Sequence, residues 1–182
     1  MALKGDPRYL SDYVEVLDEL GPAAFKVKYR GNFLVGMGLV GRVLERSSTR
    51  RTLGTSSSEE LAAAQALMGR VYPIRKAPGA RPGPMITLGQ SAENDLQIAE
   101  YTLSTHHAAF TYEGTRLMVI DLGSMNGTKV NDQAVLSVKP VHLTDKAKVA
   151  MGRLRFEFMS GDTFFARVFM LLNGANVPVP KV

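Results

Sequence analysis

The chain has 182 residues, 45% of them hydrophobic, which is enough for one ordinary core and a smaller extension. It has no cysteine and only three histidines, which excludes disulfides and thiolate zinc sites, and we expect neither a metal nor a cofactor. The net charge is +5, but residues 81–182 carry ten Lys or Arg against nine Asp or Glu, and no basic stripe with aromatic side chains is visible, so a nucleic-acid partner is not expected.

A first amphipathic helix is predicted over residues 7–20, with Asp6 as its N-cap, Pro7 as its first residue and Gly21-Pro22 as its end. Its apolar residues recur at helical spacing, so we expect it to dock on the domain that follows, and partner binding through the same face stays an alternative. No run approaches the ~18 apolar residues of a membrane span, so we expect no such span and a cytoplasmic location.

A glycine motif follows at Gly36-Met37-Gly38-Leu39-Val40-Gly41, within an apolar stretch over 25–44 whose secondary structure the sequence does not assign. It matches the G-x-G-x-x-G fingerprint of dinucleotide-binding enzymes, which requires a strand before it, a helix after it and a second strand bearing an acid. A polar stretch, rich in Ser, Thr and Arg, stands where that second strand is needed. We therefore interpret the glycines as loop or close-packing positions, with an enzyme as the weakest alternative.

A second helix is predicted near residues 58–68, with Ser58 as its cap and Gly69 after its end. Residues 1–69 are thus predicted to form an N-terminal extension with two helices and a Ser/Thr/Arg-rich linker. From residue 70 the pattern changes to short β-type runs separated by Gly, Pro, Asn and Asp, which indicates an antiparallel sandwich. Candidate strands are 70–75, 85–89, 96–98, 107–112, 116–121, 128–130, 134–138, 147–151 and 153–159, with turns at 113–115 and at Gly152.

The chain is predicted to end in a short helix capped by Ser160, with Phe164, Phe165, Val168, Phe169 and Leu172 on one face. This helix is expected to pack on the sandwich. The sandwich and this helix together are predicted to occupy residues 70–172, with a tail at 173–182.

Three motifs stand in order within the β region. They are Leu88-Gly89-Gln90-Ser91-Ala92-Glu93-Asn94-Asp95-Leu96, Leu103-Ser104-Thr105-His106-His107-Ala108 and Asp121-Leu122-Gly123-Ser124-Met125-Asn126-Gly127-Thr128. With the run over 149–156, they closely resemble the forkhead-associated (FHA) family across about residues 70–160. We therefore expect a mainly β fold, an FHA-type antiparallel β-sandwich with an N-terminal helical extension and a short C-terminal helix.

The resemblance implies a binding site for a phosphothreonine peptide in three loops at one end of the sandwich, at 89–91, 104–106 and 125–127. A phosphate dianion needs charge-assisted donors held in a rigid concavity. The implied ligand-binding residues are Gln90, Ser91, Ser104, Thr105, His106 and Asn126, and the implied loop scaffold is Gly89, His107, Gly127 and Thr128.

Individual roles follow from the same resemblance. The Ser104 hydroxyl is implied to contact the phosphate, the Asn126 amide to bond the main chain of the peptide, and His107 to brace the loops from a partly buried position. Plain structural alternatives stay open, since Asn126-Gly127 is a strong turn signal by itself and Ser104 can be a turn serine.

Gln90 departs from the family pattern, because most phosphate-binding members carry arginine after this glycine. A neutral amide in place of a guanidinium is expected to weaken phosphate binding by about ten- to a hundredfold. Lys129, a protonated His106 or an arginine of the N-terminal extension are candidates for a substitute cation.

The sequence therefore predicts a protein-recognition adaptor, not an enzyme, that binds a partner protein or peptide without a strict need for phosphate. The alternative is a phosphothreonine reader in signalling downstream of Ser/Thr kinases, with a substituted cation. A related hypothesis concerns Thr52, because Arg50-Arg51-Thr52 resembles a basophilic kinase site and a phosphate there is tethered close enough to dock on the chain's own loops.

Overall fold

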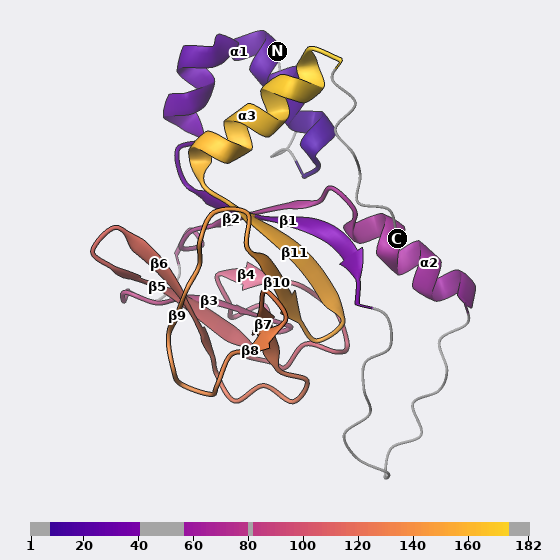
Figure 1. Cartoon of the computed structure of the whole chain (residues 1–182), viewed down its shortest axis with the longest axis vertical. Helices are drawn as coiled ribbons and strands as arrows, with labels where there is room; N and C mark the ends of the chain where they lie inside the picture. The colour runs from indigo at the N-terminus through magenta and orange to yellow at the C-terminus, as the bar shows by residue number, and fades with distance from the viewer. Residues whose placement is uncertain (1–7, 41–56, 80–81, 175–182) are drawn as a thin grey trace.

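The computed structural model describes residues 8–40, 57–79 and 82–174. Two β-sheets face each other, and helices α1 and α3 lie together over one end of the six-stranded sheet (Figure 1). The mainly β sandwich with N-terminal helices and a C-terminal helix is therefore confirmed. The motif segments 88–91, 103–107 and 122–127 all lie at strand ends and in the loops that follow them.

The larger sheet has the strand order β2-β1-β11-β10-β7-β8. Its strands are β1 (Asn32–Leu39), β2 (Val71–Ile74), β7 (Thr128–Val130), β8 (Gln133–Ala134), β10 (Lys148–Met151) and β11 (Leu154–Met159). The second sheet has the order β4-β3-β5-β6-β9, with β3 (Ile86–Gly89), β4 (Leu96–Gln97), β5 (Ala108–Glu113), β6 (Arg116–Asp121) and β9 (Val141–His142). The pairs are antiparallel, except that β3 and β4 run parallel.

Strand β1 comes from the stretch that the sequence leaves unassigned. It lies between β2 and β11, with Phe33 opposite Met159 and Leu39 opposite Leu154. Gly36 is in its centre, and a Cβ there would lie 2.0 Å from the carbonyl oxygen of Leu67 in helix α2 (Ser57–Leu67), so the close-packing interpretation of this glycine is correct. The larger sheet thus includes a strand ahead of the domain boundary predicted at residue 70.

Helix α1 spans Leu10–Lys28, so it begins later than predicted, and it includes a second helical part after Gly21 that was not predicted. Asp6 and Pro7 lie outside the described residues. The helix begins at Leu10 because Tyr9 is extended and forms a bridge with Arg70. The predicted stop at Gly21-Pro22 is a real interruption: Gly21 leaves helical geometry with a φ of 73° and a ψ of 163°, so two helical parts meet at a kink there.

The weakest strand predictions are those in the last third of the chain. The strand predicted at 134–138 is limited to β8 at Gln133–Ala134, and β9 was not predicted. Val138 has a φ of 56°, which is incompatible with a continuous strand. Both strands contain only two residues, which is too short for period-2 alternation to reveal them.

Two buried clusters meet at the larger sheet. The main cluster fills the space between the sheets, with Leu34 and Phe156 among its members. The second cluster joins α1 and α3 (Gly161–Leu172) to the outer face of β1, β2 and β11. Phe164 of α3 is fully buried there, with its ring centroid 4.0 Å from that of Phe33. The Ser160 cap is confirmed, because its side chain accepts a hydrogen bond from the Thr163 N–H.

No helix in the part of the chain that the structure describes is long and apolar enough to cross a lipid bilayer.

The position of β1 generates a test of the predicted boundary. A fragment of residues 70–182 lacks β1, so β2 loses its neighbour and the helical layer loses α1; we expect it to unfold without cooperativity, while residues 8–174 fold like the full chain. Circular dichroism melts and amide NMR spectra of the three chains give the comparison. A well-dispersed spectrum from the 70–182 fragment would establish the boundary at residue 70 instead.

Candidate recognition site at the loop end of the sandwich

The segments 89–91 and 104–106 are joined by main-chain hydrogen bonds. The Gln90 N–H donates to the Ser104 carbonyl at 3.0 Å, and the Ser91 N–H donates to the Thr105 carbonyl at 3.2 Å. Gly89 makes this approach possible, because a Cβ there would lie 2.4 Å from the Thr105 carbonyl oxygen. The predicted scaffold role of Gly89 thus has a steric basis.

The buried imidazole of His107 connects the second loop to the third. Its Nδ1 accepts a hydrogen bond from the Ser104 N–H at 3.1 Å, so the neutral ring carries its proton on Nε2 and donates it to the Gly127 carbonyl at 3.3 Å. Burial lowers the pKa of His107, and the Asp121 carboxylate and the Gly127 carbonyl offset this only in part. The ring is fully buried, not partly buried as expected, and it stays neutral as a structural bridge.

The third loop is built on the carboxylate of Asp121, which the sequence analysis did not single out. One oxygen accepts from the Gly123 and Ser124 N–H groups, each at 2.9 Å, and the other accepts from the Ser124 and Thr128 hydroxyls, each at 2.7 Å. Burial raises the pKa of Asp121, but these hydrogen bonds outweigh it and the pKa lies below its usual value. The spacing Asp-x-Gly-Ser is an Asx-turn signal that could have revealed this role.

Ser104 and Asn126 meet at the centre of the three loops. The Ser104 Oγ accepts a hydrogen bond from the Met125 N–H at 3.0 Å, so its own O–H remains available as a donor. The Asn126 Nδ2 donates to the Thr102 carbonyl at 2.8 Å, which uses one of its two amide hydrogens inside the protein. Both side chains therefore fix loop geometry, and each keeps a donor for a ligand.

The side chain of Thr102 belongs to a second network that the sequence analysis missed. The Arg153 Nε donates to Glu100 at 2.9 Å, the Arg153 N–H donates to the Thr102 Oγ1 at 3.0 Å, and the Thr102 hydroxyl donates to Glu100. Arg153 is 8% exposed and also lies over the Tyr101 ring. Because Arg153 and Glu100 are 53 residues apart in sequence, no local signal could have found the pair.

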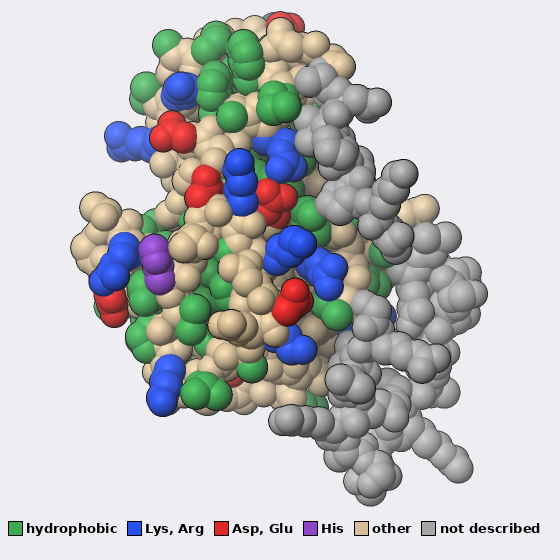
Figure 2. Space-filling model, viewed as in Figure 1, with side chains coloured by type: hydrophobic (Ala, Val, Ile, Leu, Met, Phe, Trp, Pro, Cys, Tyr) green, Lys and Arg blue, Asp and Glu red, His purple; other side chains and the backbone are tan. Residues whose placement is uncertain are grey.

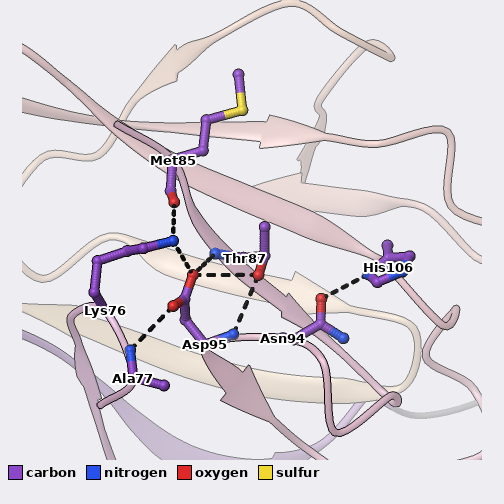
Figure 3. Close-up of polar contacts among 7 residues, drawn as sticks. All are labelled: Lys76, Ala77, Met85, Thr87, Asn94, Asp95 and His106. Atoms are coloured by element: carbon purple, nitrogen blue, oxygen red, sulfur yellow. Dashed lines mark hydrogen bonds and ion pairs between the residues drawn. The ribbon is translucent and has the colours of Figure 1, made fainter. Parts of the chain in front are cut away.

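His106 and Asn94 link the first two loops from outside (Figure 3). The His106 Nδ1 lies 2.9 Å from the Asn94 Oδ1, while the Asn94 Nδ2 donates to the carbonyls of Ser91 and Thr105. The other ring nitrogen lies 3.9 Å from a carboxylate oxygen of Glu93. Both of these side chains are exposed, so the contact is weak.

Asp95 anchors the chain behind the first loop (Figure 3). Its carboxylate accepts from the Lys76 ammonium at 2.9 Å and from the N–H groups of Thr87 and Ala77. Burial raises the pKa of Asp95, but these donors outweigh it, so the pKa is lowered. This ion pair uses the charge of Lys76 for structure and holds residues 76–77 against β3.

The structure thus brings together the predicted residues of all three loops. Gln90, Thr105 and His106 are exposed, Ser91 and Ser104 are half-buried, and Thr128 is buried. Thr52 lies outside the described residues. Across the described ranges, no three His, Cys, Asp or Glu side chains form a group suited to a metal ion.

Comparisons with known proteins agree with this architecture. The FHA domain family model matches residues 86–152. The glycogen accumulation regulator GarA of Mycolicibacterium smegmatis is 35% identical over 78 residues, 43% of this chain and 48% of that protein. The chain spans about half the length of the GarA relatives that it matches. The oxoglutarate dehydrogenase inhibitor of Corynebacterium glutamicum is 30% identical over 120 residues, 63% of this chain and 79% of that protein.

Among solved structures, the solution structure of the FHA domain of an Arabidopsis thaliana protein is similar with a TM-score of 0.48 and 16% identity, covering 87% of this chain and 94% of that one. The sequence relatives carry the assignment: the family model spans β3 to the end of β10, and the corynebacterial relative is covered over most of its length. The chain belongs to the forkhead-associated (FHA) domain family.

Proposed function

We propose that this protein is a recognition adaptor that binds a partner protein or peptide through the loops at 89–91, 104–106 and 125–127, without a strict need for phosphate. The loops offer donors that are already fixed in direction, among them the Ser104 hydroxyl and the free amide hydrogen of Asn126. Fixed donors lower the ordering cost of binding an extended segment. This adaptor function requires only that the segment is bound, and the segment undergoes no reaction.

The observation that carries the proposal is the absence of a cation from the three loops. Segments 89–91, 104–106 and 125–127 contain no Lys or Arg, and Gln90 is exposed where an arginine is usual. A ring nitrogen of His106 lies 3.9 Å from a carboxylate oxygen of Glu93, and Arg153 is buried against Glu100. A site of this composition favours neutral and hydrogen-bonding ligand groups over a dianion.

The names of the relatives support a regulatory role. One is called a glycogen accumulation regulator and the other an oxoglutarate dehydrogenase inhibitor, so each is named for its effect on another process or enzyme. We infer a protein target for this chain as well. On the face shown in Figure 2, Lys and Arg side chains are interspersed with Asp and Glu instead of forming a stripe, which fits a protein partner better than a nucleic acid. The cytoplasmic location and the phosphorylation of Thr52 stay predictions.

The proposal includes that the chain is not an enzyme. Both ring nitrogens of His107 are engaged with main-chain groups, so this histidine is not available as a general base for Ser104. The Ser104 Oγ accepts from a main-chain N–H, and within the described ranges no base is bonded to it in the way that nucleophilic catalysis requires.

A phosphothreonine reader is the second candidate. It is favoured by the Ser104 O–H, which has no acceptor among the residues that the structure describes, and by the exposed Lys129 in β7, two residues after Gly127. Matched phosphorylated and unphosphorylated threonine peptide libraries, titrated against the full chain, separate the two candidates. Similar affinity for both libraries supports the adaptor, and a preference of more than about tenfold for phosphate supports the reader.

The Gln90→Arg substitution is expected to strengthen binding of phosphothreonine peptides by about ten- to a hundredfold and to steepen its salt dependence. The Gln90 side chain is exposed beside Ser104, so a guanidinium there can reach the same ligand. Calorimetry at two salt concentrations measures both effects. Ala24→Arg adds the same charge at an exposed position of α1, in the helical layer on the outer face of the larger sheet, and is expected to change neither. Equal effects of the two variants would contradict the pocket geometry.

Alanine substitutions at His107 and Asn126 are expected to separate scaffold from site. His107→Ala removes two buried hydrogen bonds and leaves a cavity, for a loss of about 3 kcal/mol of stability, whereas Asn126→Ala removes one hydrogen bond, for a loss of about 1 kcal/mol. Asn126→Ala is expected to reduce peptide binding with only this small loss of stability, whereas a loss of binding by His107→Ala is expected to accompany its larger loss of stability. Denaturant unfolding and peptide titration of the same preparations test this, and the opposite ranking in both measurements would disprove the two roles.

A further inference from the structure

The segment 135–138, between β8 and β9, lies beside the third recognition loop and is bonded to both of its ends. The Val135 N–H donates to the Thr128 carbonyl at 2.9 Å, and the Val138 N–H donates to the Asp121 carbonyl at 3.0 Å. Ser137 also forms a parallel bridge with Asp121. The segment is therefore held in a fixed place next to the loop that carries Met125 and Asn126.

This corner of the molecule exposes three large apolar side chains. Met125 is 81% exposed, Val138 74% and Leu136 59%, while Val135 between them and the core is buried. We call Met125, Leu136 and Val138 the apolar platform. Its position matters more than its size, because it is continuous with the third recognition loop through the hydrogen bonds at Asp121 and Thr128.

The backbone of Val138 adds an independent observation. Its φ of 56° lies in the left-handed region, which a β-branched residue strongly disfavours, whereas the other turn beside β8 places Asn131 and Asp132 at positive φ, where such residues are tolerated. An exposed valine in this conformation weakens the fold without filling the core. Unfavourable backbone of this kind concentrates at functional sites.

We propose that the apolar platform binds an apolar residue of the same partner segment that the recognition loops hold. The proposal rests on the proposed function and deepens it, since it assigns part of the selectivity of that site to Leu136 and Val138. The chemistry of the segment follows from the surroundings: Lys139, whose N–H closes the turn onto the Leu136 carbonyl, and Lys129, opposite Ala134, are both exposed beside the platform. The favoured segment therefore has acidic residues next to the apolar one.

A second copy of this chain fits the platform less well. A stable dimer needs about 800 Å² of buried surface on each partner, and three side chains supply only a fraction of that area. A segment already bound by the loops needs only this small additional contact. Binding to the loops has already ordered the segment, so the contact with the platform costs little further conformational entropy.

The test uses the full chain and 15-residue peptides with a central threonine or phosphothreonine, in which one flanking position at a time is Leu, Asp or Gly. We expect the protein to prefer Leu over Gly by about tenfold at one flanking position, as burial of two partly exposed aliphatic side chains contributes about that factor. Leu136→Asn combined with Val138→Asn is expected to remove this preference and to leave binding of the Gly peptides within about twofold.

Two controls accompany the double variant. Val27→Asn replaces a valine of similar exposure, 70%, on α1 and is expected to retain the preference. Val138→Asn alone is expected to keep or raise the melting temperature, because asparagine tolerates positive φ, so a loss of selectivity cannot be attributed to unfolding.

The possible results decide between distinct conclusions. If the double variant keeps the Leu preference, or if it loses the Gly peptides as well, the platform is not a separate selectivity element, while the proposed function stands. If the unmodified chain binds none of the peptides, the proposed function fails and this proposal with it. If sedimentation shows a dimer that the double variant dissociates, the platform binds a second copy and the proposal is overturned.

Discussion

The arrangement of the recognition loops depends on one buried ring, the imidazole of His107. It accepts from the main chain of one loop and donates to the main chain of another, so the two loops are held at a distance set by the width of the ring. Its neutral state is essential, since a protonated ring would lose the acceptor that holds the Ser104 N–H. Burial, which lowers the pKa of His107, therefore also preserves the geometry of the loops.

Around His107, buried groups maintain the shape of the loops, and exposed side chains are left to contact a ligand. Main-chain groups and buried side chains such as Asp121 and Thr128 hold one another, whereas the side chains of Gln90 and Thr105 are exposed and make no bond that the fold requires. A scaffold of this kind permits changes of ligand without changes of fold. Gln90 is an example, because its main-chain N–H holds the loop while its side chain decides the charge of the site.

The sequence predicted what depends on local chemistry and missed what depends on distant partners. The cap at Ser160 acts on a residue three positions away, so its motif was informative. Gly89 and Asn126 contact Thr105 and Thr102, which are distant in sequence, and only the resemblance to the family pointed to them. Strand β1 was invisible because it is buried on both faces, by the second sheet and by the helices, and so shows no alternation. The Glu100–Arg153 pair was invisible because only the folded sheet brings those residues together.

The place of β1 in the larger sheet also has a consequence for how the protein is made. This strand spans Asn32–Leu39, yet one of its two neighbours, β11, spans Leu154–Met159 and is therefore synthesised long after it. A nascent chain must therefore carry both apolar faces of β1 without their final cover until β11 has been synthesised, and pairing over so long a separation is slow. Chaperones that shield exposed strands during translation are expected to matter more for this protein than for a sandwich whose first strand pairs with the second.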